Sequence, residues 1–330
     1  MKMIPAPSSD HQRRPFWHLS APRHAFPALL LVFCLLCGFL PAEAETAVSE
    51  NAAASVAGAL EVSPLLSSAL SLLEEGNFFV ARYNALTGSY VRAVFPLGMP
   101  YLWGGAYSRT MFSRAPDWYP TRVCYSDSEF FEEGRIYLGG FDCLGYIRWI
   151  WLDNHLGQIP SLSTLLDDLS LQRRRCLFSS SEALSRPAPA DWEELAALLT
   201  PGDLYVNRKE GGGRHIMMYL GTPRMWGFTE DSVLAGCLDD LLMIHCGLNP
   251  SYGERMQRYI DAHPDRYGTC HTTDGGVAVS LLGPSGADAP FHAHVQQTDY
   301  DYFNLDGTLL TVYPTDTVLQ SAWYPASRFD

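Results

Sequence analysis

The chain has 330 residues, 47% of them hydrophobic and 18% charged, which excludes collagenous, coiled-coil and wholly disordered proteins. The net charge is −13, and the part after residue 44, with 19 basic and 34 acidic residues, carries −15. So acidic a body argues against nucleic acid as a partner, and any anionic polymer must be recognised by a specific pocket. The length fits one large domain or one domain with a smaller appendage.

The amino terminus has the pattern of an export signal. Four positive charges lie in residues 1–24, an apolar run follows at 25–40, and Ala42-Glu43-Ala44 is a small-x-small cleavage pattern. The run has 16 residues, whereas a membrane span needs ~20, which favours a cleaved signal over a permanent anchor. We therefore expect residues 1–44 to be a signal peptide, with no stable membrane insertion after cleavage. The expected location is the periplasm, the extracellular space or the cell envelope.

The export route stays open. Arg13 and Arg14 precede Pro-Phe-Trp, which is similar to the twin-arginine pattern but also fits the positive region of a general secretory signal. Cys34 and Cys37 lie in the apolar run after bulky residues, which disfavours lipidation.

The cysteines and histidines of the mature chain show no metal-binding pattern. There is no Cys-x-x-Cys pair, so neither a zinc ribbon nor a dense disulfide framework is indicated, although three disulfides are possible in an oxidising space. Cys270-His271 and His292-Ala-His294 match no known zinc spacing. Neither a metal nor a cofactor is expected. The six cysteines are Cys124, Cys143, Cys176, Cys237, Cys246 and Cys270.

The first half of the mature chain is predicted to be helical, with one long irregular loop. Residues 45–62 are rich in Ala, Ser and Glu and are expected to be a flexible tether. A helix is predicted from Ser63 as N-cap to Gly76, and the secondary structure of 78–95 stays open between helix and hairpin. Residues 106–139 are aromatic and interrupted by proline, so they are predicted to be irregular.

The second half begins with one helix and continues with strands. Asp142 is predicted to be the N-cap of a helix that begins at Cys143 and ends before Gly157. A further helix is expected at 191–199. Helices followed by strands predict an α+β fold with an antiparallel sheet packed on the helices. Strands are predicted at Leu204–Asn207, His215–Leu220, Leu241–Cys246, Val277–Leu282 and Thr308–Tyr313.

Cys143 is the one cysteine of the six at a predicted helix start, where unpaired N–H groups can lower a thiol pKa from ~8.5 to ~3.5–7.5. A nucleophilic thiol also needs an imidazole and a group that orients it. His155 is excluded as the base because it lies ~18 Å away along the same helix. His215 and His245 can lie side by side if their strands are neighbours. A lone cysteine in an apolar helix is usually a packing residue, so the joint arrangement carries this hypothesis.

Five blocks occur in the order seen in the NlpC-type family of cell-wall cysteine peptidases. The chain resembles this family over residues 63–250. The resemblance implies a papain-like core and cleavage of peptidoglycan stem peptides, typically between γ-D-glutamate and a diamino acid. The blocks are Tyr101-Leu-Trp-Gly-Gly105, Gly140-Phe-Asp-Cys143-Leu-Gly145, Leu199-Thr-Pro-Gly-Asp-Leu204, Gly213-Arg-His215-Ile-Met-Met-Tyr-Leu-Gly221 and Met243-Ile-His245.

The resemblance assigns a role to each matched residue. Cys143 corresponds to the nucleophile, His215 to the general base and acid, and His245 to the polar residue that orients His215. Tyr101 matches a tyrosine that helps to bind the oxyanion, together with the Cys143 backbone N–H. Asp142 matches an aspartate that caps the helix and faces the substrate amine; a capping role alone is the alternative.

Three departures from the family pattern bear on specificity. Leu144 replaces a serine that follows the nucleophile, which puts the γ-D-glutamyl specificity in doubt. Residues 106–142 form a longer link before Cys143 than the family usually has, and 222–242 are inserted between the two histidines.

The domains expected are a peptidase core at 63–250, with a helical lead-in at 63–95, and a C-terminal β extension at 251–330 packed on it. The function expected is an exported cysteine hydrolase whose partner is the peptidoglycan stem peptide. The alternatives are a catalytically inactive envelope-binding module of the same fold, and an amidase or acyl transferase that acts on another envelope amide. The bond cleaved, the disulfides and the oligomeric state stay open.

Overall fold

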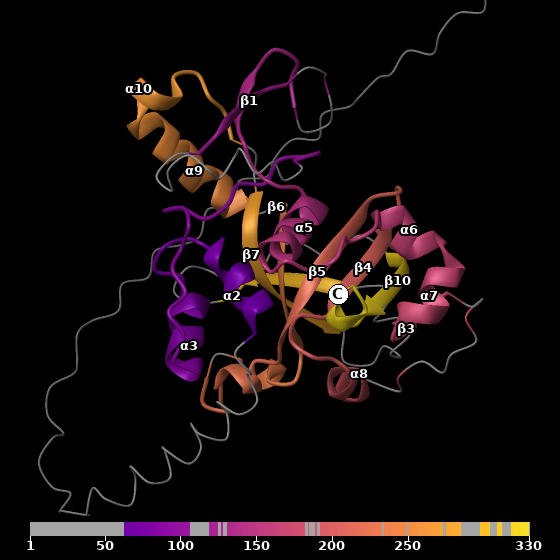
Figure 1. Ribbon diagram of the computed structural model, residues 1–330. Coiled ribbons are helices and arrows are strands. Elements are labelled where there is room, and N and C mark those ends of the chain that lie inside the picture. The colour runs from indigo at the N-terminus through magenta and orange to yellow at the C-terminus, as the bar shows by residue number, and fades with distance from the viewer. Residues whose placement is uncertain are drawn as a thin grey trace, which may run out of the picture. The chain divides into compact units, whose positions relative to one another are not determined.

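In the part of the chain that the computed structural model describes, one antiparallel sheet of eight strands organises the fold (Figure 1). The strand order is β3-β10-β4-β5-β6-β7-β8-β9, so the chain is an α+β protein with an antiparallel sheet, as its order of elements predicts. The strands are β3 Phe178–Ser179, β4 Leu204–Lys209, β5 Arg214–Gly221, β6 Leu241–Leu248, β7 Gly275–Pro284, β8 Thr298–Phe303, β9 Leu309–Thr311 and β10 Val318–Tyr324.

The structure describes residues 63–105, 119–124, 127, 131–181, 184, 189, 192–232, 234–248, 250–272, 275–284, 298–303, 309–311 and 318–329. The expected signal peptide at 1–44 and tether at 45–62 lie outside these residues, as do the first part of the 106–139 loop, His292 and His294. Within the described part of the chain, no helix is both long and apolar enough to cross a membrane.

The predicted strands β4, β5, β6 and β7 are confirmed, and each is longer than its apolar pattern. β9 falls within the fifth predicted strand, whose other residues are not described. β3, β8 and β10 were not predicted. The residues after 250, expected to be an extension, supply β7 beside β6, and β10 between β3 and β4.

The lead-in contains two helices, α2 Pro64–Ser71 and α3 Phe78–Thr87. The prediction that the first helix continues to Gly76 is wrong. The carbonyl groups of Ser71 and Leu72 accept hydrogen bonds from the backbone N–H groups of residues 94 and 99, which ends the helical pattern there. α3 begins where the Asn77 side chain accepts a hydrogen bond from the Phe79 N–H, so the open choice at 78–95 is resolved as a helix followed by extended chain.

Helix α5, Cys143–Asp153, begins at the predicted residue, and the Asp142 carboxylate caps it by accepting a hydrogen bond from the Gly145 N–H at 2.6 Å. It packs against β5 and β6 (Figure 1). Leu144 and Leu152, both counted in its apolar pattern, are only partly buried, whereas Tyr146 and Ile150 are fully buried. The buried face of α5 therefore differs from the face that the apolar pattern of its leucines predicted.

The described part of the predicted irregular loop contains a small two-stranded ribbon, β1 Thr121–Val123 paired with β2 Ile136–Leu138, so the prediction of an irregular segment is wrong there. Other elements absent from the sequence prediction cover the sheet or its connections. They are α6 Leu162–Asp167, α7 Leu169–Arg175, η2 Arg224–Trp226, η3 Ala235–Cys237, α9 Pro250–Ala262, α10 Pro264–Tyr267 and η4 Ala326–Arg328; the predicted helix at 191–199 is α8 Trp192–Leu198.

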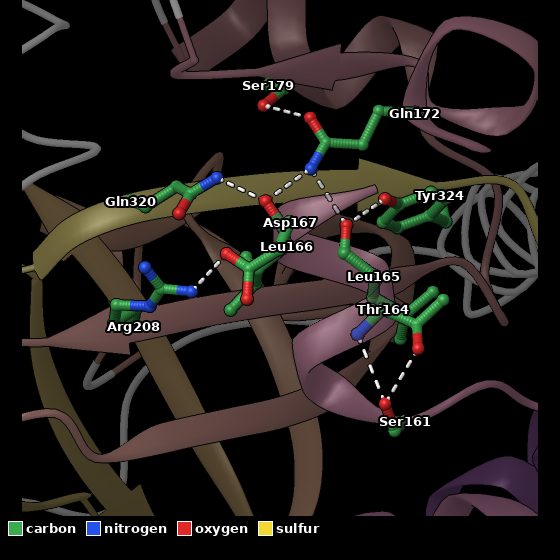
Figure 2. Close-up of polar contacts among 10 residues, drawn as sticks. All are labelled: Ser161, Thr164, Leu165, Leu166, Asp167, Gln172, Ser179, Arg208, Gln320 and Tyr324. Atoms are coloured by element: carbon green, nitrogen blue, oxygen red, sulfur yellow. Dashed lines mark hydrogen bonds and ion pairs between the residues drawn. The ribbon is translucent and has the colours of Figure 1, made fainter. Parts of the chain in front are cut away.

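Figure 2 shows how the end of α6 is fixed to β10 and α7 by side chains that bind its last carbonyl groups. Gln172, which is fully buried, donates to the carbonyl oxygens of Leu165 and Leu166 at 2.9 and 2.6 Å. Gln320 donates to Leu166, and the Tyr324 hydroxyl donates to Leu165. Carbonyl groups at a helix end need such partners when they are buried, so these contacts tie the strand near the C-terminus to the helices.

The two faces of the sheet carry different apolar clusters. Alternate residues of β5 and β6, among them Ile216 and Ile244, join the larger cluster with α5 and α2. The intervening residues, among them Met217 and Met243, join a smaller cluster that includes Leu195 of α8. Because side chains alternate along a strand, this register decides on which face each polar residue of the site lies.

Candidate active site

Cys143 lies in the first turn of α5, where close backbone approaches hold the helix start. A Cβ atom at Gly145 would lie 2.1 Å from the Gly105 carbonyl oxygen, and one at Gly140 would lie 2.0 Å from the Pro100 carbonyl oxygen. The same Gly105 oxygen accepts a hydrogen bond from the Asp142 N–H at 3.1 Å. The glycines of the Trp-Gly-Gly and Asp-Cys-Leu-Gly blocks therefore let two chain segments touch, which fixes the position of the thiol.

Tyr101 lies beside this helix start. Its backbone N–H donates to the Gly275 carbonyl at 2.8 Å, and it forms a parallel bridge with Phe141, two residues before Cys143. Burial raises the pKa of the Tyr101 hydroxyl well above its usual range, and the neighbouring Cys143 adds to the shift. Tyr101 is therefore a protonated hydrogen-bond donor near the thiol at neutral pH.

His215 and His245 form a hydrogen-bonded pair on neighbouring strands, as predicted. Nε2 of His215 lies 3.0 Å from Nδ1 of His245, and Nε2 of His245 lies 3.1 Å from the Ser280 hydroxyl on β7. His215 is partly exposed, whereas His245 and Ser280 are buried. Nδ1 of His215 is the ring nitrogen of the pair that these contacts leave open.

Gly247 makes room for both rings. A Cβ atom at this position would lie 3.0 Å from His245 Nδ1 and 3.3 Å from His215 Cε1. Position 247 follows His245 by two residues on β6, so it shares the same sheet face. A larger residue there would occupy the space in which the rings meet.

A row of polar side chains crosses this face of the sheet. In the register, Ser321 of β10 pairs with Asn207 of β4, and Asn207 pairs with His215 of β5. His245 and Ser280 extend the row into β6 and β7. Asn207, Ser280 and Ser321 are each 0% exposed. The histidine pair is thus part of a longer polar row, buried except at His215, which the sequence analysis did not identify.

The thiol and the imidazole pair come from opposite faces of the sheet. Cys143 packs in the cluster that contains Ile216 and Ile244, whereas His215 shares the face of Met217. They approach at the beginning of β5, where the backbone N–H of Ile216, next to His215, hydrogen-bonds to the sulfur. Among the described residues, no hydrogen bond joins the sulfur to the His215 ring.

Burial keeps the three groups neutral. It raises the pKa of the Cys143 thiol to about 12, and the nearby Asp142 adds to the shift against the hydrogen bonds from Ile216 and Leu144. The expected lowering of this pKa by the helix start is therefore outweighed. Burial lowers the pKa of His245 to about 3 and that of His215 well below its usual value, with a contribution from Lys209 in both cases. At rest the site contains a thiol and two neutral imidazoles.

Several residues singled out in the sequence have other roles. Cys246 faces away from His245, as predicted, and its thiol donates to the Phe141 carbonyl at 3.2 Å. His155 lies just beyond the far end of α5. The 222–242 insertion packs on the lead-in, where Trp226 contacts Phe79 with ring centroids 5.3 Å apart. The six cysteines after residue 44, all within the described ranges, form no disulfide.

Ser280 is the functional candidate that the sequence analysis missed. A single polar residue within the apolar run of β7 is the signal that could have found it. Its hydrogen bond to His245 depends on β7 pairing with β6, and the local sequence does not predict which strand pairs with β6.

The described residues contain no group of three or more His, Cys, Asp or Glu side chains placed to hold a metal ion. A pocket of about 490 Å³ lies elsewhere, lined by residues that include Ser63, Leu156, Asp203 and Ala326. Asp203 is buried and accepts hydrogen bonds from the N–H groups of Thr200 and Ala326, so it stabilises the chain rather than serving the thiol. No family model, curated protein or solved structure matches this chain.

Proposed function

We propose that the protein is an exported cysteine hydrolase, with a papain-like core of the NlpC type, that cleaves an amide bond in peptidoglycan stem peptides. One observation carries the proposal: a cysteine in the first turn of a helix touches the backbone beside a histidine that is hydrogen-bonded to a second, buried histidine. Five sequence blocks in the family order support the same reading. The proposal includes the family's papain-like fold and export of the protein, neither of which the α+β architecture alone defines.

The proposed reaction is amide hydrolysis through a thioester. The Cys143 sulfur attacks the carbonyl carbon while its proton passes to Nδ1 of His215. The C–N bond then breaks and His215 returns that proton to the leaving amine. Water attacks the thioester, again losing a proton to His215, and the C–S bond breaks to release the acid and the thiol. One water is consumed, and an acid and an amine are formed.

The neighbouring residues fit supporting roles in this reaction. His245 stays neutral, so its Nδ1 lone pair can accept the Nε2–H of His215 when that ring becomes charged. The Tyr101 hydroxyl and the backbone N–H of Cys143 are the donors proposed for the oxyanion. Leu144 occupies the position of the usual family serine, so the proposal does not assign the diamino acid or the bond cleaved. The masses of the reaction products identify both.

The test is to incubate the protein with defined muropeptides and to weigh the products. The wild type is expected to give two new masses whose sum exceeds that of the substrate by one water, whereas Cys143→Ala gives none. Cys270→Ala is the matched control, because it removes another buried thiol that binds only its own neighbour's carbonyl. Equal product formation by wild type and Cys143→Ala would end the proposal.

The raised thiol pKa favours a second candidate, an envelope-binding module that keeps the fold without turnover. Alkylation separates the two. A hydrolase loses all activity when iodoacetamide labels Cys143, and its labelling depends on His215. In a binding module, His215→Ala leaves the labelling rate unchanged, and muropeptides bind without new masses. An acyl transferase would instead give a product that contains the added amine.

A further inference from the structure

We propose that Ser280 is a positioning residue that accepts the Nε2–H of His245 and thereby holds the lone pair of His215 Nδ1 ready for the Cys143 proton. Its catalytic consequence rests on the proposed function, whereas the tautomers themselves can be observed without any substrate.

The geometry places Ser280 at the end of a three-member chain. Its hydroxyl lies 3.1 Å from His245 Nε2, and His245 Nδ1 lies 3.0 Å from His215 Nε2. Across from His245, β7 presents Ala278, whose small side chain lets the imidazole lean toward the next residue on that face. Both Ser280 and His245 are buried, so water cannot replace either contact at no cost.

Two proton arrangements satisfy these distances. In the first, each histidine carries its proton on Nε2: His215 donates to His245, His245 donates to Ser280, and His215 Nδ1 keeps a lone pair. In the second, every donor is reversed, so Ser280 donates to His245 and His215 carries a proton on Nδ1. Only the first arrangement lets His215 accept a proton from the thiol. The two arrangements are therefore a ready and an unready state of the same chain.

Two considerations favour the first arrangement. The Nε2–H tautomer is the intrinsically preferred form of a neutral imidazole, and the first arrangement uses it in both rings. A serine hydroxyl accepts through two lone pairs and can rotate its hydrogen away. The hydrogen bond made by one ring nitrogen then sets the proton of the other.

The experiment uses the protein labelled with ¹⁵N-histidine and records long-range ¹H–¹⁵N spectra, in which protonated and bare ring nitrogens have distinct shifts. Signals are assigned by comparison with His215→Gln and His245→Gln. The wild type is expected to show Nε2–H in both rings. Ser280→Ala removes the acceptor and is expected to move the His245 proton to Nδ1, with His215 following. The rate of Cys143 alkylation is then expected to fall about tenfold, the fold-change of ~1.4 kcal/mol.

Two variants make the readout specific. Ser280→Thr keeps the hydroxyl and is expected to keep the wild-type tautomers and alkylation rate. Ser321→Ala is the matched control, since it removes an equally buried serine of the same polar row whose hydroxyl makes no hydrogen bond to either histidine. An Nδ1–H on His245 in the wild type, or unchanged tautomers in Ser280→Ala, would overturn the inference. Nε2–H tautomers that Ser280→Ala shifts, together with absent muropeptide cleavage, would support Ser280 and remove the proposed function alone.

Discussion

Nε2 of His215 lies 3.0 Å from Nδ1 of His245, and the two ring planes stand at 89°. The rings thus share one hydrogen bond instead of stacking. A second proton between these nitrogens would place two donors against each other, so protonating both rings at once is unfavourable. The pair is organised to bind one extra proton, on the open nitrogen of His215.

The partner of His215 must accept a hydrogen bond. His245→Gln retains an accepting oxygen, so kcat for muropeptide cleavage is expected to fall only about tenfold. His245→Leu removes the acceptor, and kcat is expected to fall by roughly 10²-fold or more. Circular dichroism spectra that match the wild type control for folding. Equal activity of the Gln and Leu variants would contradict an orienting role for His245.

Space for the rings depends on Gly247. Gly247→Ala adds a methyl group 3.0 Å from His245 Nδ1, so the rings must separate, and the free energy of unfolding is expected to fall by about 1–3 kcal/mol. Activity is expected to fall with it. Gly213→Ala is the control, because a Cβ there has nothing within 4 Å. Urea denaturation measures both, and equal stabilities of the two variants would show that the rings do not need this space.

The charge of Asp142 affects the thiol separately from its cap. Asp142→Asn keeps a good N-cap, so stability is expected to stay near that of the wild type, while the pKa of Cys143 falls because a nearby negative charge is removed. Asp142→Ala loses the cap as well and is expected to cost about 1 kcal/mol. The pH dependence of iodoacetamide labelling reports the thiol pKa. An unchanged profile in Asp142→Asn would mean that burial alone sets it.

Acid is expected to destabilise the protein through the two histidines. Their folded pKa values lie below the ordinary 6.5, at about 3 for His245, so between these values the unfolded chain binds more protons. Stability is therefore fully present above pH 6.5 and falls as pH decreases, by up to about 1.4 kcal/mol per pH unit for each ring. Denaturation at pH 7 and pH 5 measures the slope.

His245→Gln removes one of these groups and is expected to have a shallower acid slope than the wild type. Equal slopes would place the acid sensitivity elsewhere.

On the alkaline side, the thiol pKa is raised from 9.0 to about 12, so stability is expected to decline above pH 9 as the unfolded thiol ionises. Cys143→Ala is expected to remove that decline.

The sequence predicted the middle of the sheet because β4 to β7 are apolar runs bounded by glycine and proline. Three strands at the sides of these four, β3, β8 and β10, were missed for physical reasons. The β8 sequence alternates Asp and Tyr and has no continuous apolar run, and β10 contains Gln320 and Ser321 among its apolar residues. α9 carries a narrow stripe, with Tyr252, Met256 and Ile260 buried at four-residue spacing. Tertiary contacts, not local pattern, make these segments regular.

The candidate site shows the same difference between features set by local sequence and features set by tertiary contacts. Cys143 and Asp142 were predicted from a local signal, the start of a helix. The pairing of His215 with His245 was predicted on the condition that their strands are neighbours, and β5 does pair with β6. Ser280 depends on which strand lies beside β6, and the thiol pKa depends on burial, so neither could be obtained from neighbouring residues. The five short blocks thus led to the candidate site, whereas the contacts that set the protonation of its residues come from segments far apart in the chain.

Because β10 lies between β3 and β4, the sheet can be completed only late in synthesis. Ser179 of β3 pairs with Ala322 of β10, and β10 also pairs with the neighbouring edge of β4. A nascent chain that has not passed residue 324 therefore exposes unpaired strand edges, which other chains can join. We expect ribosome-bound chains to stay sensitive to proteases until β10 emerges. Until then the edge of β4 that pairs with β10 stays unpaired, whatever the earlier segments have already formed.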